Sequence, residues 1–216
     1  MTAPSPTEGE QRRLLELKYN VTAWFYDILD YPWERQYRHW RPQLVGNLRG
    51  EVLEAGVGTG RNLRHYNSSV NLIAIDLCKA MVKIAKKRGG AAVCMLDCRQ
   101  EDATKMASIP SNHFDWIIST FLCCVLPYNL QVLAIRQFER VLKSGGQIRL
   151  LDMVYSKIPQ FRRRQDFFTP FVEKVYGARF DRNVLENLQE SSRLRITNTY
   201  FLKKDVYQVI EGYLVD

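Results

Sequence analysis

The sequence has little that would place it across a membrane or around a metal ion. No window approaches the roughly 18 consecutive apolar residues that a membrane-spanning helix requires, and the N-terminus lacks the charged-then-apolar pattern of a secretory signal. We therefore expect a cytoplasmic protein. Histidine is scarce, and no cysteine has the CxxC or Cys/His spacing of a zinc site, so no metal site is predicted. The cysteines are expected to be free thiols in a reducing compartment: Cys78, Cys94, Cys98, Cys123 and Cys124.

Acidic residues are fewer than basic ones. Lys and Arg number 31 against 23 Asp and Glu, which leaves a formal net charge of +8. Such an excess favours anionic partners, for example phospholipid headgroups or nucleic acid, although many soluble proteins carry it without using it. Apolar residues at 46% and charged residues at 25% are ordinary for a globular protein. The composition of residues 1–10 predicts a flexible tail, and the length of 216 residues fits a single domain over residues 11–216.

The apolar pattern alternates between strands and helices. In residues 11–48 the apolar residues recur at helical spacing and many of them are aromatic. We expect two or three helices there, with boundaries at Pro32 and Pro42. Five buried strands should follow, over residues 51–56, 71–77, 91–97, 114–122 and 147–155. Helices are expected between them, from residue 61, over 79–89 and from residue 130 to a stop at Gly145 and Gly146. This alternation predicts a parallel sheet with helices on both faces and a ligand site at the carboxyl ends of the strands.

The last part of the chain has a different pattern. Residues 193–202 and 205–215 are strand-like runs separated by two lysines, which predicts a closing antiparallel hairpin. Between the fifth strand and this hairpin, residues 156–190 form an insertion in which arginines mix with Phe and Tyr. Its composition suits an anionic membrane surface, with a solvated charged face as the alternative. The side chains concerned are Phe161, Arg162, Arg163, Arg164, Phe167 and Phe168.

A glycine-rich turn follows the first expected strand, at Gly56, Gly58 and Gly60. Their missing side chains allow a tight turn and a close approach of the backbone to a ligand at a helix N-terminus. The spacing differs from the GxGxxG of a dinucleotide site, and an acid, Glu54, precedes it. Because a carboxylate there would repel a pyrophosphate, the turn suits a cationic ligand such as S-adenosylmethionine. Asp76, at the end of the second strand, is placed to accept hydrogen bonds from ribose hydroxyls.

The sequence around this turn resembles class I S-adenosylmethionine-dependent methyltransferases. The resemblance covers about residues 45–155 and rests on four segments in order: EVLEAGVGTGRNL, IAIDLCKAMV, FDWIIS and RVLKSGGQIRLLD. Three further runs, YNVTAWFYDILDYP, GVGTGRNL and STFLCCVLP, are similar to one branch of these enzymes. That branch holds ubiquinone/menaquinone C-methyltransferases, bacterial phosphatidylethanolamine N-methyltransferases and thiol methyltransferases. The resemblance implies an α/β, Rossmann-like fold with a seven-stranded, mostly parallel sheet, a C-terminal antiparallel hairpin and an N-terminal helical lid over residues 11–48.

The resemblance also implies which residues hold the cofactor. The turn from Glu54 to Gly60 would hold the methionine end, and Asp76 and Leu77 would meet the ribose and adenine. The adenine edge would lie against Asp97 and Cys98, since Asp97 directly follows the third expected strand. The loop after that strand is longer than is usual in the family. Two later residues, Gln100 and Asp102, are therefore alternatives to Asp97.

The remaining implied contacts lie on either side of the cofactor. Met81 would lie against the adenine face, with a place in the core as an equally supported alternative. Thr120 and Phe121 would lie beside the methionine moiety. Tyr19 and Tyr26 are seven residues apart, hence on one helix face, and match tyrosines that cover the cofactor in the resembling enzymes. They would act as a lid and position the acceptor, helped by cation–π attraction, whereas the simpler alternative is packing on the sheet.

The predicted activity is methyl transfer from S-adenosylmethionine, with S-adenosylhomocysteine as product, to a small amphipathic acceptor. A phospholipid amine headgroup or quinone-like precursor is expected on the acceptor side, formed by the first helices and residues 156–190, with the enzyme peripheral on the inner membrane face. Alternatives are a soluble thiol, amine or metalloid acceptor, or a non-catalytic cofactor-binding or RNA-associated protein. No RNA-binding module accompanies the positive charge, so nucleic acid is not the expected acceptor. Only a protonated acceptor needs a base, and the three histidines are expected to be surface or packed residues: His39, His65 and His113.

Overall fold

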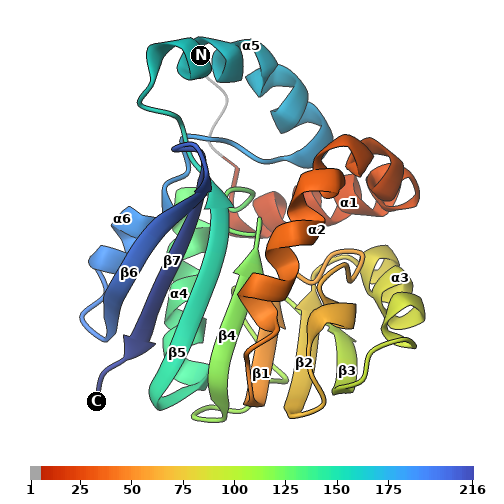
Figure 1. Cartoon of the computed structure of the whole chain (residues 1–216), viewed down its shortest axis with the longest axis vertical. Helices are drawn as coiled ribbons and strands as arrows, with labels where there is room; N and C mark the ends of the chain where they lie inside the picture. Colours follow the sequence, from red (N-terminus) through yellow and green to blue (C-terminus); the bar gives the residue numbers. More distant parts are fainter. Residues whose placement is uncertain (1–5) are drawn as a thin grey trace.

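The computed structural model describes residues 6–216, which form a seven-stranded sheet covered by helices (Figure 1). The strand order across the sheet is β3-β2-β1-β4-β5-β7-β6. In chain order the strands are β1 Gly50–Ala55, β2 Val70–Asp76, β3 Met95–Gln100, β4 Phe114–Thr120, β5 Leu142–Met153, β6 Leu194–Lys203 and β7 Tyr207–Leu214. Neighbours from β3 to β5 are parallel, and β7 runs antiparallel to β5 and β6. The predicted seven-stranded, mostly parallel sheet with a C-terminal hairpin is confirmed.

Apolar side chains alternate between the two faces of the sheet. Val52 packs in one buried cluster and its neighbour Leu53 in the other, because successive strand residues point to opposite faces. Buried side chains on these faces each contribute roughly 1.5–3 kcal/mol to folding. The helices on the Val52 face are α2 Tyr31–Val45 and α3 Lys79–Gly89, and those on the Leu53 face are α4 Tyr128–Val141 and α6 Val184–Gln189. Helices on both faces are therefore confirmed.

The first helix, α1 (Glu8–Leu29), begins with a capping box. The Thr7 hydroxyl accepts a hydrogen bond from the Glu10 backbone N–H, and the Glu10 carboxylate accepts one from the Thr7 backbone N–H. This arrangement satisfies two backbone donors that a helix start leaves unpaired. The helix thus begins inside the span predicted as a flexible tail, of which residues 1–5 lie outside the described part of the chain.

The insertion of residues 156–190 contains α5 (Pro159–Tyr176) and α6. α5 crosses over the carboxyl ends of the parallel strands, beside α1 (Figure 1). Three hydrogen bonds join these helices: the Lys18 ammonium donates to the Glu173 carbonyl, the Tyr19 hydroxyl to the Tyr176 carbonyl, and the Tyr176 hydroxyl to the Leu29 carbonyl, the last at 2.9 Å. α1 and α5 therefore cover the strand ends together. Among residues 6–216, no helix combines the length and apolar character needed to cross a bilayer.

The segment after the glycine turn is not the predicted helix. It holds a single 3-10 turn, η1 (Leu63–His65). Asn62 and Tyr66, on either side of it, point inward and donate hydrogen bonds to the Glu54 carboxylate. Because both side chains bind Glu54 at the end of β1, the segment packs against the sheet and does not form a regular helix. The glycine turn therefore does not lead into a long helix N-terminus, as the sequence predicted.

The third strand begins and ends later than predicted. The turn after α3 takes up the first residues of the predicted strand, through a hydrogen bond from the Ala92 N–H to the Gly89 carbonyl at 2.9 Å. β3 then pairs in parallel register with β2, from Asn71 opposite Met95 to Asp76 opposite Gln100. Pairing with β2 therefore sets the carboxyl end of β3 at Gln100, three residues after the predicted end.

Two predicted helix boundaries are also wrong. Pro42 lies inside α2, which continues to Val45, because a proline in the last turn costs the helix one N–H donor without ending it. α4 ends at Val141, before the two glycines, Gly145 and Gly146, that were predicted to stop it, since the chain enters β5 at Leu142. The other predicted boundary, Pro32, does lie in the first turn of α2.

Candidate active site

Two adjoining cavities lie at the carboxyl ends of the parallel strands, under α1 and α5. The first has a volume of about 130 Å³ and is lined by the glycine turn, the end of β2, the β3–β4 loop and α1. The second, of about 90 Å³, lies between α1, α2, α5 and the start of β7. Five side chains line both cavities: Tyr19, Tyr26, Asp30, Phe121 and Val125. The cavities therefore adjoin at this shared wall, so that two ligands bound in them would lie next to each other.

The glycine turn forms one side of the first cavity. Gly58 has a φ of 53°, and a side chain at this position would enter open space. Gly60, with a φ of 79°, is required for another reason, since a Cβ there would lie 2.9 Å from the Cα of Ala85 in α3. Gly58 therefore leaves room for a ligand, and Gly60 lets the turn pack against α3. Of the predicted glycines, Gly56 and Gly58 line the cavity, whereas Gly60 does not.

Asp76 holds the turn from the end of β2. Its carboxylate accepts hydrogen bonds from the backbone N–H groups of Gly58 and Cys78, both at 2.9 Å. Burial raises the pKa of Asp76 to about 6, and the two N–H donors oppose that rise. A carboxylate has about four acceptor positions, so capacity is left for ligand hydroxyls. Asp76 and the following Leu77 both line the cavity, where the sequence placed them.

Glu54 lies beneath the turn and does not line either cavity. It is 1% exposed, and its oxygens accept hydrogen bonds from Asn62 at 2.7 Å and Tyr66 at 3.0 Å. Burial raises its pKa to about 7 against these donors. Asn62, which does line the first cavity, also accepts a bond from Arg41 at 2.6 Å. Glu54 is therefore a positioning residue for the cavity wall, in place of the direct ligand contact that the sequence predicted.

Met81, Thr120 and Phe121 all line the first cavity. Met81 is 2% exposed and packs beside Tyr19 and Tyr26, so it belongs both to the core and to the cavity wall. The Thr120 hydroxyl accepts a hydrogen bond from Asn62 at 3.2 Å. Phe121 has a φ of 61°, a conformation that a bulky residue adopts only at a cost and that is concentrated at functional sites.

Asp97 and Cys98 do not reach the cavities. Both lie in the middle of β3, opposite Ile73 and Ala74 of β2. The Asp97 side chain is half exposed and pairs with Arg99 at 2.7 Å, whereas Cys98 is buried against the α2 face of the sheet. Because β3 ends later than predicted, the acids at its carboxyl end are Glu101 and Asp102, and both line the first cavity. Of the three residues that the sequence offered for the adenine edge, Asp97 and Gln100 do not line the cavity, whereas Asp102 does.

Tyr19 and Tyr26 lie on one face of α1, as their spacing predicted, and line both cavities. Their ring centroids are 6.4 Å apart. Burial raises the pKa of both hydroxyls well above the usual value for tyrosine, so both are neutral phenols. They can cover a ligand and present aromatic faces to it, but they do not act as bases.

Sequence reasoning missed an ion-pair network that ties α1 to the glycine turn. Asp27 of α1 accepts hydrogen bonds from the Thr59 hydroxyl at 2.9 Å and from Arg61 at 3.0 Å, and it also pairs with Arg88 of α3. Arg61 pairs in addition with Glu34 of α2 at 2.8 Å. These residues are far apart along the chain and follow no local motif, so the sequence carries no signal that would have joined them.

Asp30 is the other residue that the sequence did not reveal. It lies between α1 and α2 and lines both cavities. Neither cavity is lined by a histidine, and among the described residues no group of three or more His, Cys, Asp or Glu side chains could hold a metal ion. Asp30 is therefore the titratable group on the wall between the cavities that is best suited to carry a charge.

Comparison with known proteins places the sequence among methyltransferases. A family described as a methyltransferase domain matches residues 53–150. The chain is 28% identical over 172 residues to the probable tRNA methyltransferase 9B of Mus musculus, covering 78% of this chain and 35% of that protein. It is 30% identical over 105 residues to the phosphatidylethanolamine N-methyltransferase of Cereibacter sphaeroides, covering 48% of this chain and 50% of that one.

Other similar proteins match over more of their own length. An uncharacterised protein of Methanocaldococcus jannaschii is 30% identical over 175 residues, with 76% of this chain and 77% of that protein covered. A SAM-dependent methyltransferase from Methanosarcina mazei, of known crystal structure, superposes with a TM-score of 0.61 at 18% identity, covering 78% and 94% of the two chains. The chain thus spans about a third of the length of the mouse relative and half that of the phosphatidylethanolamine methyltransferase.

Proposed function

We infer the function from the premise that this chain belongs to the family of S-adenosylmethionine-dependent methyltransferases. We propose that it transfers a methyl group from S-adenosylmethionine in the first cavity to a small amphipathic acceptor in the second. The proposed acceptor is a phospholipid amine headgroup or a quinone-like ring. The observation that carries this proposal is the wall of five side chains that the two cavities share.

The first cavity fits a nucleoside with a cationic methionine arm. Gly58 leaves space in the turn, Asp76 keeps free acceptor capacity, and Leu77 and Met81 offer apolar surface for a purine. S-adenosylmethionine, when bound, supplies a methyl group attached to a sulfonium. The chain then has to align the two ligands and exclude water from the space between them, which can supply most of the catalysis of an in-line displacement.

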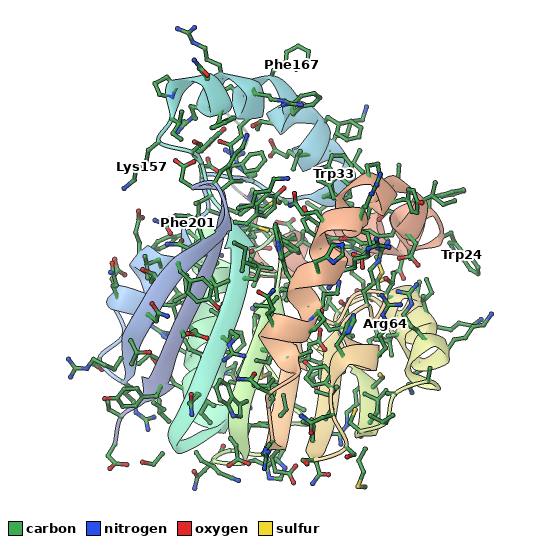
Figure 2. All side chains as sticks on the ribbon, in the orientation of Figure 1. Trp24, Trp33, Arg64, Lys157, Phe167 and Phe201 are labelled. Atoms are coloured by element: carbon green, nitrogen blue, oxygen red, sulfur yellow. The ribbon has the colours of Figure 1, made fainter. Side chains whose placement is uncertain are left out.

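An apolar stripe on the outer side of α1 supports delivery of the acceptor from a membrane. Leu17, Val21, Trp24 and Ile28 recur at helical spacing, and each is more than half exposed. On α5, Phe167 is 78% exposed. Figure 2 shows Trp24 and Phe167 pointing away from the protein. Aromatic and aliphatic side chains in this position favour burial at the boundary between lipid headgroups and acyl chains.

Positive charge accompanies the apolar stripe. Arg163 and Arg164 are exposed on α5, and Arg13 is exposed on α1. A basic residue near an anionic bilayer contributes about 1 kcal/mol of attraction. We therefore propose an anionic membrane as the partner from which the acceptor reaches the second cavity.

A soluble thiol, amine or metalloid is the alternative acceptor, and it would use the same cavities without a membrane. The mouse relative is named for tRNA, which the net charge of +8 would also suit. The second cavity, however, is lined mainly by aromatic and aliphatic side chains. A small amphipathic acceptor matches such a lining better than RNA does.

Sedimentation with lipid vesicles tests the membrane part of this proposal. The chain should sediment with vesicles rich in phosphatidylglycerol and not with neutral ones. Trp24→Ala should lower the bound fraction several-fold. Met95→Ala is the matched control, because Met95 is 73% exposed at the opposite end of the sheet and should not touch the bilayer. Methyl transfer to a soluble acceptor or RNA without vesicle binding would contradict a lipid acceptor.

A further inference from the structure

The second cavity contains one carboxylate, that of Asp30, among aromatic rings, and no lysine, arginine or histidine lines it. We propose, on the basis of the function proposed above, that this cavity binds its acceptor as an ammonium ion. Asp30 then accepts the proton that the nitrogen must lose before it is methylated. The acceptor class is thus an amine, such as the headgroup of an aminophospholipid, and not a quinone-like ring.

The Asp30 carboxylate is nearly buried but has few partners. The residue is 9% exposed. Within residues 6–216 no group donates a hydrogen bond to its side chain, and its nearest cation is Arg61, 3.6 Å away. Arg61 already pairs more closely with Asp27 and Glu34, at 3.0 and 2.8 Å. Asp30 therefore keeps its acceptor positions for something that enters the cavity.

Aromatic rings from five parts of the fold surround the same space. Tyr26 and Trp33 each meet Tyr176 of α5 with ring centroids 6.0 Å apart. On the other side, Tyr37 of α2 packs 4.8 Å from Phe121, which follows β4, and 5.7 Å from Tyr207 of β7. Ring faces attract a cation within about 6 Å, most strongly where water is excluded. A carboxylate within such a group of rings is the arrangement that selects a cation over a neutral ligand of the same shape.

Four tyrosine hydroxyls lie near enough to Asp30 for its charge to affect their pKa values. Burial is the largest cause that raises the pKa of four tyrosines on the cavity wall, and repulsion from Asp30 adds to the rise in each: Tyr26, Tyr37, Tyr176 and Tyr207. These tyrosines come from α1, α2, α5 and β7. Because Asp30 itself lines the second cavity, its charge acts on a ligand there as well as on the arginine beside it.

Proton transfer to Asp30 completes the reaction of an amine. The ammonium gives one proton to the carboxylate, which leaves a neutral nitrogen with a lone pair. That lone pair forms the bond to the methyl carbon while the carbon–sulfur bond breaks and its electron pair stays on sulfur. The methylated nitrogen carries the positive charge, and Asp30 releases its proton to solvent after the product leaves.

Binding of a cation and of its neutral counterpart tests the proposal without catalysis. Choline and 3,3-dimethylbutan-1-ol have the same shape and differ in charge. In the presence of S-adenosylhomocysteine, the chain should bind choline about tenfold more tightly by calorimetry, a factor typical of cation–π contacts with a nearby carboxylate. In Asp30→Asn this preference should fall to about twofold or less. Equal preference in the variant and the wild type would overturn the role of Asp30.

Two further variants separate this role from a structural one. Asp166→Asn removes an exposed carboxylate on α5 that pairs only with Arg162 of the same helix, and it should keep the full preference for choline. Trp33→Leu removes a ring from the second cavity alone and should weaken choline binding while S-adenosylhomocysteine binds as in the wild type. Loss of S-adenosylhomocysteine affinity in Asp30→Asn would instead assign Asp30 to the support of the first cavity.

The pH dependence of methyl transfer gives a second readout. The pKa of Asp30 is raised to about 6, mainly by burial. Arg61 and Arg41 act to lower this pKa, whereas Glu34 and Asp27 act to raise it. Since the ionised form accepts the proton, kcat/KM with an aminophospholipid should rise as the pH passes about 6. Asp30→Asn should lose this rise. Transfer to a quinol lipid but not to an aminophospholipid would overturn the amine inference alone, whereas failure to bind S-adenosylhomocysteine would overturn the proposed function.

Discussion

At the scale of single residues, Glu54 is a carboxyl group whose pKa the fold raises to near neutral pH. It is 1% exposed and is bound by two neutral donors, an amide and a phenol. These donors compensate its charge less well than water does, so burial raises its pKa to about 7. Because Asn62 links this group to the cavity wall, its charge state bears on both stability and the site.

Glu54→Gln should remove part of the pH dependence of stability. The folded-state pKa of about 7 lies above the ordinary value of 4.5, so the folded protein binds more protons than the unfolded chain between these values. The free energy of unfolding should therefore fall as the pH rises from about 4.5 to 7. In the variant this fall should be shallower, and the remaining slope should come from buried acids such as Asp76 and Asp152, whose pKa values are raised to about 6.

Urea unfolding at several pH values from 4.5 to 7.5 measures this dependence. A slope unchanged between Glu54→Gln and the wild type would show that the Glu54 carboxyl is not the group that titrates.

The residues of the glycine turn could be predicted because their chemistry is local. A strand, three glycines and an acid follow one another within a few positions, and Gly58 and Asp76 line the cavity as expected. Asp102 could not be separated from Asp97 in this way, because only the pairing of β3 with β2 decides which acid lies at the strand end. Asp30 had no signal at all, since its partners come from distant elements.

At the scale of elements, α1 is joined to the rest of the protein by polar contacts more than by an apolar face. Its one fully buried residue is Ala23, whereas Asp27, Tyr19 and Lys18 bind the glycine turn, α3 and α5. Partly exposed ion pairs of this kind each contribute only about 0.2–1 kcal/mol. α1 should therefore open locally more easily than the strands do, and a ligand beneath it should hold it closed.

S-adenosylhomocysteine should accordingly slow tryptic cleavage of α1 at Arg13 and Lys18. Three residues of this helix line the first cavity, so cleavage requires an opening that releases the ligand. At a ligand concentration 100 times the dissociation constant, the closed state gains about 2.7 kcal/mol, which corresponds to cleavage about 100-fold slower. Asp27→Ala should speed cleavage in the absence of ligand.

Mass spectrometry of the fragments identifies the cleaved bonds. Cleavage at Lys203 and Lys204, between β6 and β7 and outside both cavities, serves as the internal control. Equal protection at both places would indicate global stabilisation and would contradict a lid role for α1.

The apolar pattern of α1 predicted a helix but not its orientation. Val21, Trp24 and Ile28 have the spacing of a core-facing stripe, and yet each is more than 70% exposed. Periodicity shows that such residues share a face and does not show what covers that face. The same limit applies to the segment after Gly60, where inward bonds from Asn62 and Tyr66 replaced the expected helix.

At the scale of the whole molecule, the sheet was the most predictable feature. Buried strands alternating with helices predict a parallel sheet. The two lysines between the last two strand-like runs, residues 193–202 and 205–215, predict the antiparallel hairpin. The second cavity was not predictable, because it is built by α1, α2, α5 and β7 only after all four pack together. The acceptor therefore has to be inferred from the folded molecule, whereas the glycine turn of the proposed cofactor site is visible in the sequence.

Calorimetric titration with S-adenosylmethionine tests the central claim, that the first cavity is a cofactor site formed at Gly58. Gly145 is the matched control, since it also has a positive φ, of 72°, and open space where a side chain would lie, but it is outside both cavities. Valine at either position should cost roughly 1 to 3 kcal/mol of stability through backbone strain. Gly58→Val should weaken binding at least about 100-fold, equivalent to about 2.8 kcal/mol, while Gly145→Val binds as the wild type does. Unchanged affinity in Gly58→Val, or equal loss in both variants, would contradict this account.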